Sequence, residues 1–201
     1  MTIHLEVPKK FGMIVNQAQQ VANEVFRPIA CKYDSNDHEY PKELDMLASL
    51  IDGMNASGEA SAGARGVRRE SNGDTSNKNG TNMSGVLSII EACWGDVALV
   101  LSMPRQGLGN AAIASVADDE QHKRFDKTWA AMAITEPSFG SDSAAVQATA
   151  MLDGDHYVLN GEKIFVTAGG RCDSVVVWAS LDKSKGRAAI KSFVVEKGTP
   201  G

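Results

Sequence analysis

Two hydroxyl side chains and one aromatic ring stand in the second half of the sequence at a spacing that suits a flat ligand. Thr135 ends the run AAMAIT, while Phe165 and Thr167 belong to the run KIFVT. If residues 162–167 form a strand, alternation places Lys163, Phe165 and Thr167 on one side of it. An aromatic ring packs on the face of a planar ring system, and a threonine hydroxyl bonds an atom at its rim. The pattern therefore indicates a surface that holds a flat, apolar ring with polar atoms at its edge.

A polar turn of small residues, Ser138 to Ser143, adds a second kind of chemistry. Gly140 has no side chain, and the backbone N–H groups of such a turn are left unpaired by a sheet, which suits a phosphate or pyrophosphate. Ring and turn together suggest an FAD-like ligand. Ordinary structure explains the same residues, with Phe165 as core, Thr167 as a solvent-facing strand residue and Ser141 in a simple turn or helix cap. The pattern alone leaves both interpretations open.

Two longer motifs contain these residues. The segment A-x-T-E-P-x-x-G-S-D reads AITEPSFGSD at 133–142, and an aromatic-x-T segment reads Phe165-Val166-Thr167. In these motifs the chain resembles the acyl-CoA dehydrogenase family, over the whole β-region to FVVEKGTPG at 193–201 and more loosely before it. The resemblance implies a helical N-terminal domain, a β middle domain and a helical C-terminal domain that together enclose FAD.

The resemblance also implies roles for individual residues. Thr135 and Thr167 are expected to hydrogen-bond the isoalloxazine, and the ring of Phe165 to lie over it. Ser141 matches the position that contacts the acyl-CoA substrate, and Arg187 belongs to a basic loop, 182–187, where the CoA phosphates are expected to pass. The implied cofactor-binding residues are Met132, Ala133, Ile134, Thr135, Gly140, Ser141, Phe165, Val166 and Thr167. The chain departs from the family pattern at Ser138-Phe139 and at Phe165, where the family usually has small residues and tryptophan.

The activity implied by the resemblance is the α,β-dehydrogenation of an acyl-CoA thioester to the trans-2-enoyl-CoA, in fatty-acid or acyl-CoA catabolism. A glutamate of the C-terminal domain removes the α-proton in that family, so we assign no catalytic residue here and do not give this role to Glu136. We expect the chain to be the N-terminal half of such an enzyme and inactive by itself. The implied partners are an electron-transfer flavoprotein or similar acceptor and further subunits of a homo- or hetero-oligomer.

The elements that position these residues are predicted as strands joined by tight turns. Asp153-Gly154 and Asn160-Gly161 accept the positive φ angles of type I′ turns, so three strands are expected to form an antiparallel meander. The predicted strands are 129–135, 146–152, 156–159, 162–167, 174–180 and 189–195. They form the incomplete, barrel-like antiparallel β-domain of an α+β protein, over residues 129–201.

Residues 1–128 are predicted to form a helical domain. A helix is expected over 8–30, kinked or ended by Pro28, because its apolar residues recur at three- and four-residue spacing. Further helices are expected over 41–51, 83–101, 107–116 and 118–125, with Asp118 as an N-cap. In the helix 83–101 the residues Val86, Ile90, Cys93, Trp94, Val97 and Leu101 share one face.

Two stretches of this region carry weaker signals. Residues 55–80 are rich in Gly, Ser, Asn and charges and are expected to form a mobile surface loop, because they bury too little apolar surface. Residues 107–112, GLGNAA, match G-x-G-x-x-A of dinucleotide-binding folds. Four residues separate this motif from the preceding apolar run, which also continues a helical stripe. We therefore favour helix over a nucleotide-binding turn.

Composition restricts the class of protein. The chain has 201 residues, 43% of them hydrophobic, with 20 basic and 25 acidic residues and a net charge of −5. No basic block suggests nucleic acid, and no secretory leader or membrane span is evident. Cys31, Cys93 and Cys172 match no metal spacing and are expected to be reduced thiols, so we expect a cytoplasmic protein without a metal site.

Two other functions stay open on the sequence. A non-catalytic subunit would complete the flavin or CoA site of a partner, and a flavin monooxygenase or oxidase would use the same scaffold for another reaction.

Overall fold

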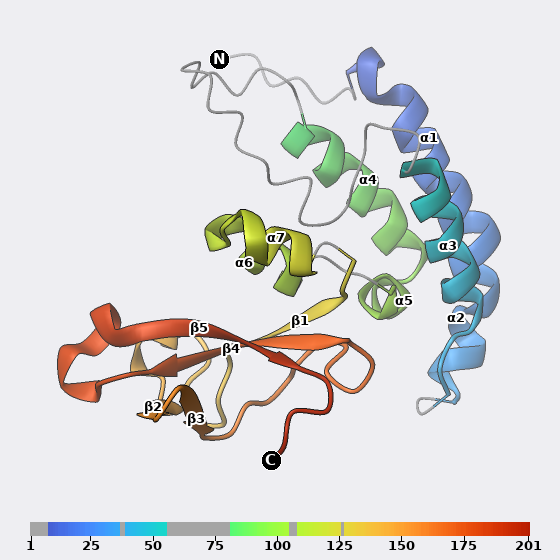
Figure 1. Ribbon diagram of the computed structural model, residues 1–201. Helices are drawn as coiled ribbons and strands as arrows, with labels where there is room; N and C mark the ends of the chain where they lie inside the picture. Colours follow the sequence, from blue (N-terminus) through green and yellow to red (C-terminus); the bar gives the residue numbers. More distant parts are fainter. Residues whose placement is uncertain (1–7, 37–38, 56–80, 105–107, 126) are drawn as a thin grey trace, which may run out of the picture. The chain divides into compact units, whose positions relative to one another are not determined.

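The structure is a computed structural model, and it describes residues 8–36, 39–55, 81–104, 108–125 and 127–201 (Figure 1). The chain divides into two compact units, Met1–Leu50 with Glu70–Met103 and Ile51–Arg69 with Pro104–Gly201. The predicted surface loop lies outside the described residues from 56 to 80. The α+β class is confirmed, with helices preceding an open sheet. The domain boundary at 128 stays a prediction.

The first unit is helical. A 3-10 turn, Lys9–Phe11, leads into α1, Gly12–Val21, which continues through a π-helical turn, Ala22–Phe26, into α2, Arg27–Asp34. The remaining helices that begin in this unit are α3, Glu43–Asn55, α4, Thr81–Gly95, and α5, Val97–Ser102. None of the described helices is long and apolar enough to span a membrane.

Pro28 was predicted to kink or end the first helix, but the helix continues through it without a sharp break. It occupies the first turn of α2, where a missing N–H is tolerated, and the π-helical turn directly before it changes the hydrogen-bond pattern of the helix. Gly95 of α4 lies against this turn, since a Cβ there would be 2.9 Å from Ala22. Gly95 is therefore a residue of α4 that packs directly on the π-helical turn.

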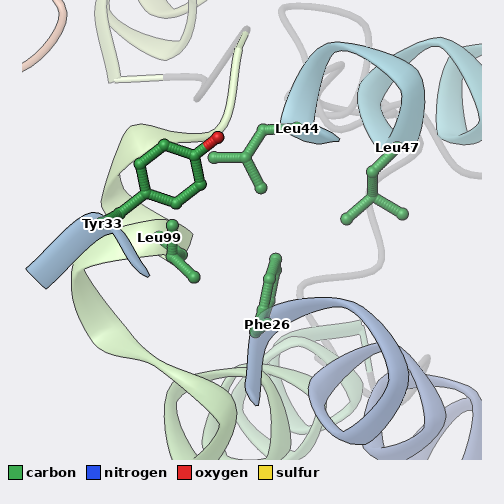
Figure 2. Close-up of a cluster of buried hydrophobic side chains, with 5 residues drawn as sticks. All are labelled: Phe26, Tyr33, Leu44, Leu47 and Leu99. Atoms are coloured by element: carbon green, nitrogen blue, oxygen red, sulfur yellow. The ribbon is translucent and has the colours of Figure 1, made fainter. Parts of the chain in front are cut away.

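Five buried side chains form the core of this unit. Phe26 and Tyr33 come from the first helical stretch, Leu44 and Leu47 from α3, and Leu99 from α5, and Figure 2 shows them converging on one centre. The Tyr33 hydroxyl reaches the edge of this cluster and donates a 2.5 Å hydrogen bond to Glu43. The cluster thus ties α3 and α5 to the first helical stretch.

The predicted helix 83–101 is divided in two at Asp96. The Asp96 carboxylate accepts a 2.8 Å hydrogen bond from the Leu99 N–H and so caps α5. The apolar face predicted for this helix is exposed except at Cys93, which is half-buried, and α4 packs on α1. Five side chains of the predicted face and Met83, each more than half exposed, form what we call the outward row: Met83, Val86, Ile90, Trp94, Val97 and Leu101.

The second unit places two helices on a five-stranded sheet (Figure 1). The helices are α6, Leu108–Val116, and α7, Asp119–Phe125, and the strands are β1, Ala130–Ala133, β2, Thr149–Asp153, β3, His156–Asn160, β4, Ser174–Ser180, and β5, Ile190–Glu196. Asp118 caps α7 as predicted, accepting 2.8 Å from the Gln121 N–H. Ile113 and Phe125 pack on Ala130 and Val176, which closes one face of the sheet.

The sheet is mixed, whereas the hairpin pattern predicted antiparallel neighbours. β4 pairs in parallel with β1 and, at Thr149↔Ser180, with β2, while β2–β3 and β4–β5 are antiparallel. The β2–β3 hairpin is confirmed, but only Gly154 of its two loop residues has positive φ, so its turn is not type I′. The third strand of the predicted meander, 162–167, is irregular chain.

The glycine motif 107–112 is not a nucleotide-binding turn. The preceding apolar run is helix α5, and Gly109 and Asn110 lie inside α6. Gly109 packs against β1, where a Cβ would be 2.3 Å from the Ala131 carbonyl oxygen. Asn110 donates to the Thr128 carbonyl at 2.7 Å and accepts from the Ala130 N–H at 3.0 Å. Both residues serve the packing of helix on strand.

Candidate functional site

A buried carboxylate lies between the two predicted flavin-binding segments. Glu136 is 4% exposed, and its Oε1 accepts hydrogen bonds from Lys163 Nζ and from the Ala148 N–H, both at 2.8 Å. Its Oε2 accepts from the Gln147 N–H at 2.6 Å. One side chain therefore joins the end of the first segment to the chain before β2 and to the loop that contains the second segment.

These donors stabilise the ionised form of Glu136. Burial by itself raises a carboxyl pKa, but the hydrogen bonds from Lys163 and from two backbone N–H groups outweigh it, so the pKa of Glu136 lies below its ordinary value. Lys163 also donates to the Ile134 carbonyl at 3.1 Å. Since three donors take up most of its lone pairs and its pKa is lowered, the buried Glu136 is poorly placed to accept a proton from a ligand.

In the loop after β3, the side chains do not have the predicted orientation. Lys163 and Phe165 were expected on one side of a strand, but the Lys163 side chain is 10% exposed and Phe165 is 88% exposed. Phe165 has φ 56° and Ala168 φ 63°, a left-handed conformation that non-glycine residues rarely adopt. The backbone reverses here because Lys163 is drawn inward to Glu136, and period-two alternation no longer applies.

The two segments lie side by side through a backbone hydrogen bond, from the Ile164 N–H to the Thr135 carbonyl at 3.0 Å. Thr135, Val166 and Thr167 are partly exposed, whereas Ala133 is buried in β1. Within the described chain, the N–H groups of Phe165, Val166 and Thr167 donate to no protein acceptor. An exposed ring beside free donors suits a planar ligand with acceptor atoms on its edge.

The turn that follows Glu136 leaves its backbone open to a ligand. Glu136 and Phe139 exchange two backbone hydrogen bonds of 3.1 Å, and a 3-10 turn, Ser143–Ala145, follows. A Cβ at Gly140 would meet nothing within 4 Å, and Ser141 is exposed. In the described chain the N–H groups of Gly140 and Ser141 also donate to no protein atom. Unpaired N–H groups of this kind suit a phosphate-bearing group, and phosphate binding by this turn stays a prediction.

A small cavity lies next to this turn. The 3-10 turn Ser143–Ala145 contacts the segment Lys183–Ala189, which carries Arg187, and so brings the neighbourhoods of Ser141 and Arg187 together. The cavity has a volume of about 100 Å³ and is lined by Ala144, Ala145, Val146, Gln147, Ser180, Lys183, Gly186 and Ile190. Lys183 Nζ bonds the Gln147 side-chain oxygen at 3.0 Å, and the buried Ser180 hydroxyl has no partner among the described residues.

Two features of the site were missed by sequence reasoning. The bonds of Glu136 to Lys163 and to the chain before β2 span up to 27 residues, and no local pattern pairs them. The Ser180 hydroxyl is hidden in a strand rich in valine.

A second cavity of about 120 Å³ lies at Cys172 and Ser174, and neither cavity is lined by Thr135, Phe165 or Thr167. Convergence of those three side chains on one ligand stays a prediction.

Comparison with known proteins bears on the same residues. Residues 131–201 match the family model "Acyl-CoA dehydrogenase, middle domain", which includes both segments and the basic loop. A short-chain-specific acyl-CoA dehydrogenase of Clostridium acetobutylicum is 51% identical over 71 residues, 35% of this chain and 19% of the relative. Residues 131–201 belong to the middle domain of the acyl-CoA dehydrogenase family.

Similarity to this family extends beyond the middle domain. A 3-(aryl)acrylate reductase of Clostridium sporogenes is 30% identical over 195 residues, which are 94% of this chain and 48% of the relative. The structure of butyryl-CoA dehydrogenase from Megasphaera elsdenii aligns with a TM-score of 0.75 at 26% identity, covering 99% of this chain and 51% of that one. The chain thus spans about half the length of the relatives that it matches throughout.

Proposed function

We propose that this chain forms the FAD-facing part of an enzyme that converts an acyl-CoA thioester to its trans-2-enoyl-CoA. Family membership and the geometry around Glu136 support the proposal. The observation that carries it is Phe165, an aromatic side chain that is 88% exposed in a left-handed conformation beside unpaired backbone donors. Strained backbone conformations cluster at active sites and ligand-binding sites.

The residues of the chain have separable parts in this proposal. Phe165 packs on the isoalloxazine, and Thr135, Thr167 and the N–H groups of residues 165–167 bond its rim. Gly140 and Ser141 face the phosphate-bearing and acyl-thioester groups, with Arg187 near the CoA phosphates. FAD, when bound, supplies the acceptor for the hydride that leaves the substrate β-carbon. An electron-transferring flavoprotein is the proposed acceptor of the electrons, and the cytoplasm is the proposed location.

Removal of the α-proton is not assigned to this chain. Glu136 is the carboxylate of the flavin-facing segment, and three donors already occupy it. A general base needs a free lone pair within reach of the substrate proton. We therefore expect no turnover by the 201-residue chain alone.

The test is a flavin titration of the purified chain, followed by dye reduction with butyryl-CoA. We expect FAD absorbance that remains with the protein after gel filtration, and no dye reduction. Failure to retain FAD contradicts the proposed cofactor site, whereas sustained dye reduction contradicts the absence of a base. Oxygen consumption coupled to hydroxylated product instead identifies a monooxygenase.

A further inference from the structure

We infer that Glu136 is a positioning residue, which holds Phe165 and its loop at a fixed distance from Thr135. The inference rests on the proposed function, because it explains how the chain prepares the flavin-facing surface before a ligand binds. It assigns to Glu136 no proton transfer and no contact with the flavin.

The contacts of Glu136 define a bracket between three segments that are separate in the sequence. Lys163 Nζ is 2.8 Å from Glu136 Oε1 and 3.1 Å from the Ile134 carbonyl, so the lysine is held from both sides. One residue further on, the Ile164 N–H bonds the Thr135 carbonyl at 3.0 Å. The loop thus meets the end of the first segment at three consecutive hydrogen bonds, two of them made by a charged side chain.

Burial makes these contacts specific. The Lys163 and Glu136 side chains are 10% and 4% exposed, so water offers little replacement for a lost partner. Both carboxylate oxygens are in use, one for Lys163 and Ala148 and one for Gln147. A glutamine amide has only one acceptor oxygen, so in either orientation its NH2 group faces a donor. The substitution therefore costs at least one of the three hydrogen bonds in either orientation and removes the charge that faces Lys163, which weakens the bracket.

The conformation of the loop depends on the bracket. Phe165 follows Lys163 by two residues and adopts φ 56°, which is unfavourable unless neighbouring contacts impose it. Figure 1 shows β3 and β4 as regular strands, while the chain between them, 161–173, is not a strand. The ion pair of Glu136 with Lys163 is therefore a side-chain contact that restrains the loop two residues before the strained Phe165.

The experiment compares E136Q with E162Q in the full 201-residue chain. Glu162 is exposed and adjacent to Lys163, so E162Q makes the same chemical change without touching the bracket. Amide hydrogen exchange is measured for peptides covering 161–168 and 174–180, and FAD affinity by flavin fluorescence. We expect E136Q to raise exchange of the Ile164 amide, which bonds the Thr135 carbonyl, to leave β4 protected, and to weaken FAD binding by about tenfold or more, as for a buried donor that loses its charged partner.

Each outcome decides one of the two claims. Equal exchange and equal FAD affinity in E136Q and wild type overturn the positioning role. Faster exchange over β4 as well as the loop also overturns it, because the role is then general stability. If wild type binds no FAD but E136Q releases only the loop, the positioning role stands and the proposed function falls. If E136Q does not fold, K163Q keeps the carboxylate on its backbone donors, and unchanged exchange in K163Q overturns the inference.

Discussion

Phe165 places an apolar ring in water and its backbone in a disfavoured conformation, and both properties are unfavourable in the unbound chain. The ring is 88% exposed, so its burial contributes little to folding. The left-handed backbone costs a residue with a Cβ about 1–2 kcal/mol, a strain that glycine does not carry. A residue of this kind is explained by binding rather than by stability.

Replacing Phe165 by glycine should therefore separate stability from binding. F165G relieves the backbone strain, which raises the free energy of unfolding, but glycine also gains freedom in the unfolded chain, which lowers it. We therefore expect a net rise of up to about 1 kcal/mol. The same variant should lose the ring contact and weaken FAD affinity by up to about tenfold. Urea denaturation and flavin titration measure the two effects. A loss of stability above about 1 kcal/mol would show that the ring belongs to the core.

Glu43 titrates differently from an ordinary surface glutamate. The hydrogen bond from Tyr33 at 2.5 Å is the main cause, with smaller contributions from the backbone and from Lys32 at 3.1 Å, and together they lower the pKa of Glu43 to about 2. Because the pKa in the folded chain lies below the ordinary glutamate value of 4.5, the stability contributed is present above pH 4.5 and is lost as pH falls toward 2.

The matching prediction concerns E43Q. Its deficit in unfolding free energy relative to wild type should be full at pH 7 and should shrink between pH 4.5 and pH 2. The effect is expected to be small and to weaken with added salt, since the Lys32 and Glu43 side chains are 46% and 39% exposed. Urea denaturation at pH 7 and pH 3 measures it. A deficit that is equal at both pH values would mean that the carboxylate charge is not responsible.

Helix α6 approaches β1 closely enough that one hydrogen atom is the largest side chain tolerated at Gly109. A Cβ there would lie 2.3 Å from the Ala131 carbonyl oxygen and 2.4 Å from that of Ala130. Both neighbours are backbone atoms of a strand and cannot rotate away. The helix and strand must therefore separate to accept a larger residue.

G109A should destabilise the second unit by about 1–3 kcal/mol, the usual cost of overpacking. G85A is the matched control, because Gly85 is also helical and a Cβ there would meet nothing within 4 Å. That variant should gain about 0.5–1 kcal/mol from helix propensity. Thermal melts followed by circular dichroism compare the two. Equal stability of G109A and wild type would contradict the close packing.

Local patterns predicted the elements better than their pairing. The helices and the β2–β3 hairpin follow from apolar spacing and from Asp153-Gly154, both of which are short-range signals. The segment 162–167 has the composition of a strand, but the contact of Lys163 with Glu136 overrides that preference. The parallel pairing of β1 with β4 joins residues more than forty positions apart, for which the sequence carries no local signal.

At the scale of the whole molecule, the sequence predicted the α+β class and the family, since long motifs identify both. It predicted an apolar face on residues 83–101 but not the side on which that face lies. Ser84 and Ser88 of α4 are half-buried and Gly95 packs on Ala22 of the π-helical turn, while the larger side chains of the outward row are exposed. Periodicity gives the faces of a helix, while packing decides which of them is covered.

The outward row on α4 and α5 leads us to expect that stability depends on how much protein is present. The four of its side chains on α4, from Met83 to Trp94, expose an apolar strip about 17 Å long at a rise of 1.5 Å per residue. Any molecule that covers this strip in the folded state alone shifts the unfolding equilibrium by mass action. We expect the melting temperature of the chain to rise with its own concentration, and I90K to remove that dependence. Thermal melts at two concentrations a hundredfold apart measure it, and a midpoint that stays constant would mean that copies of the chain leave the strip in water.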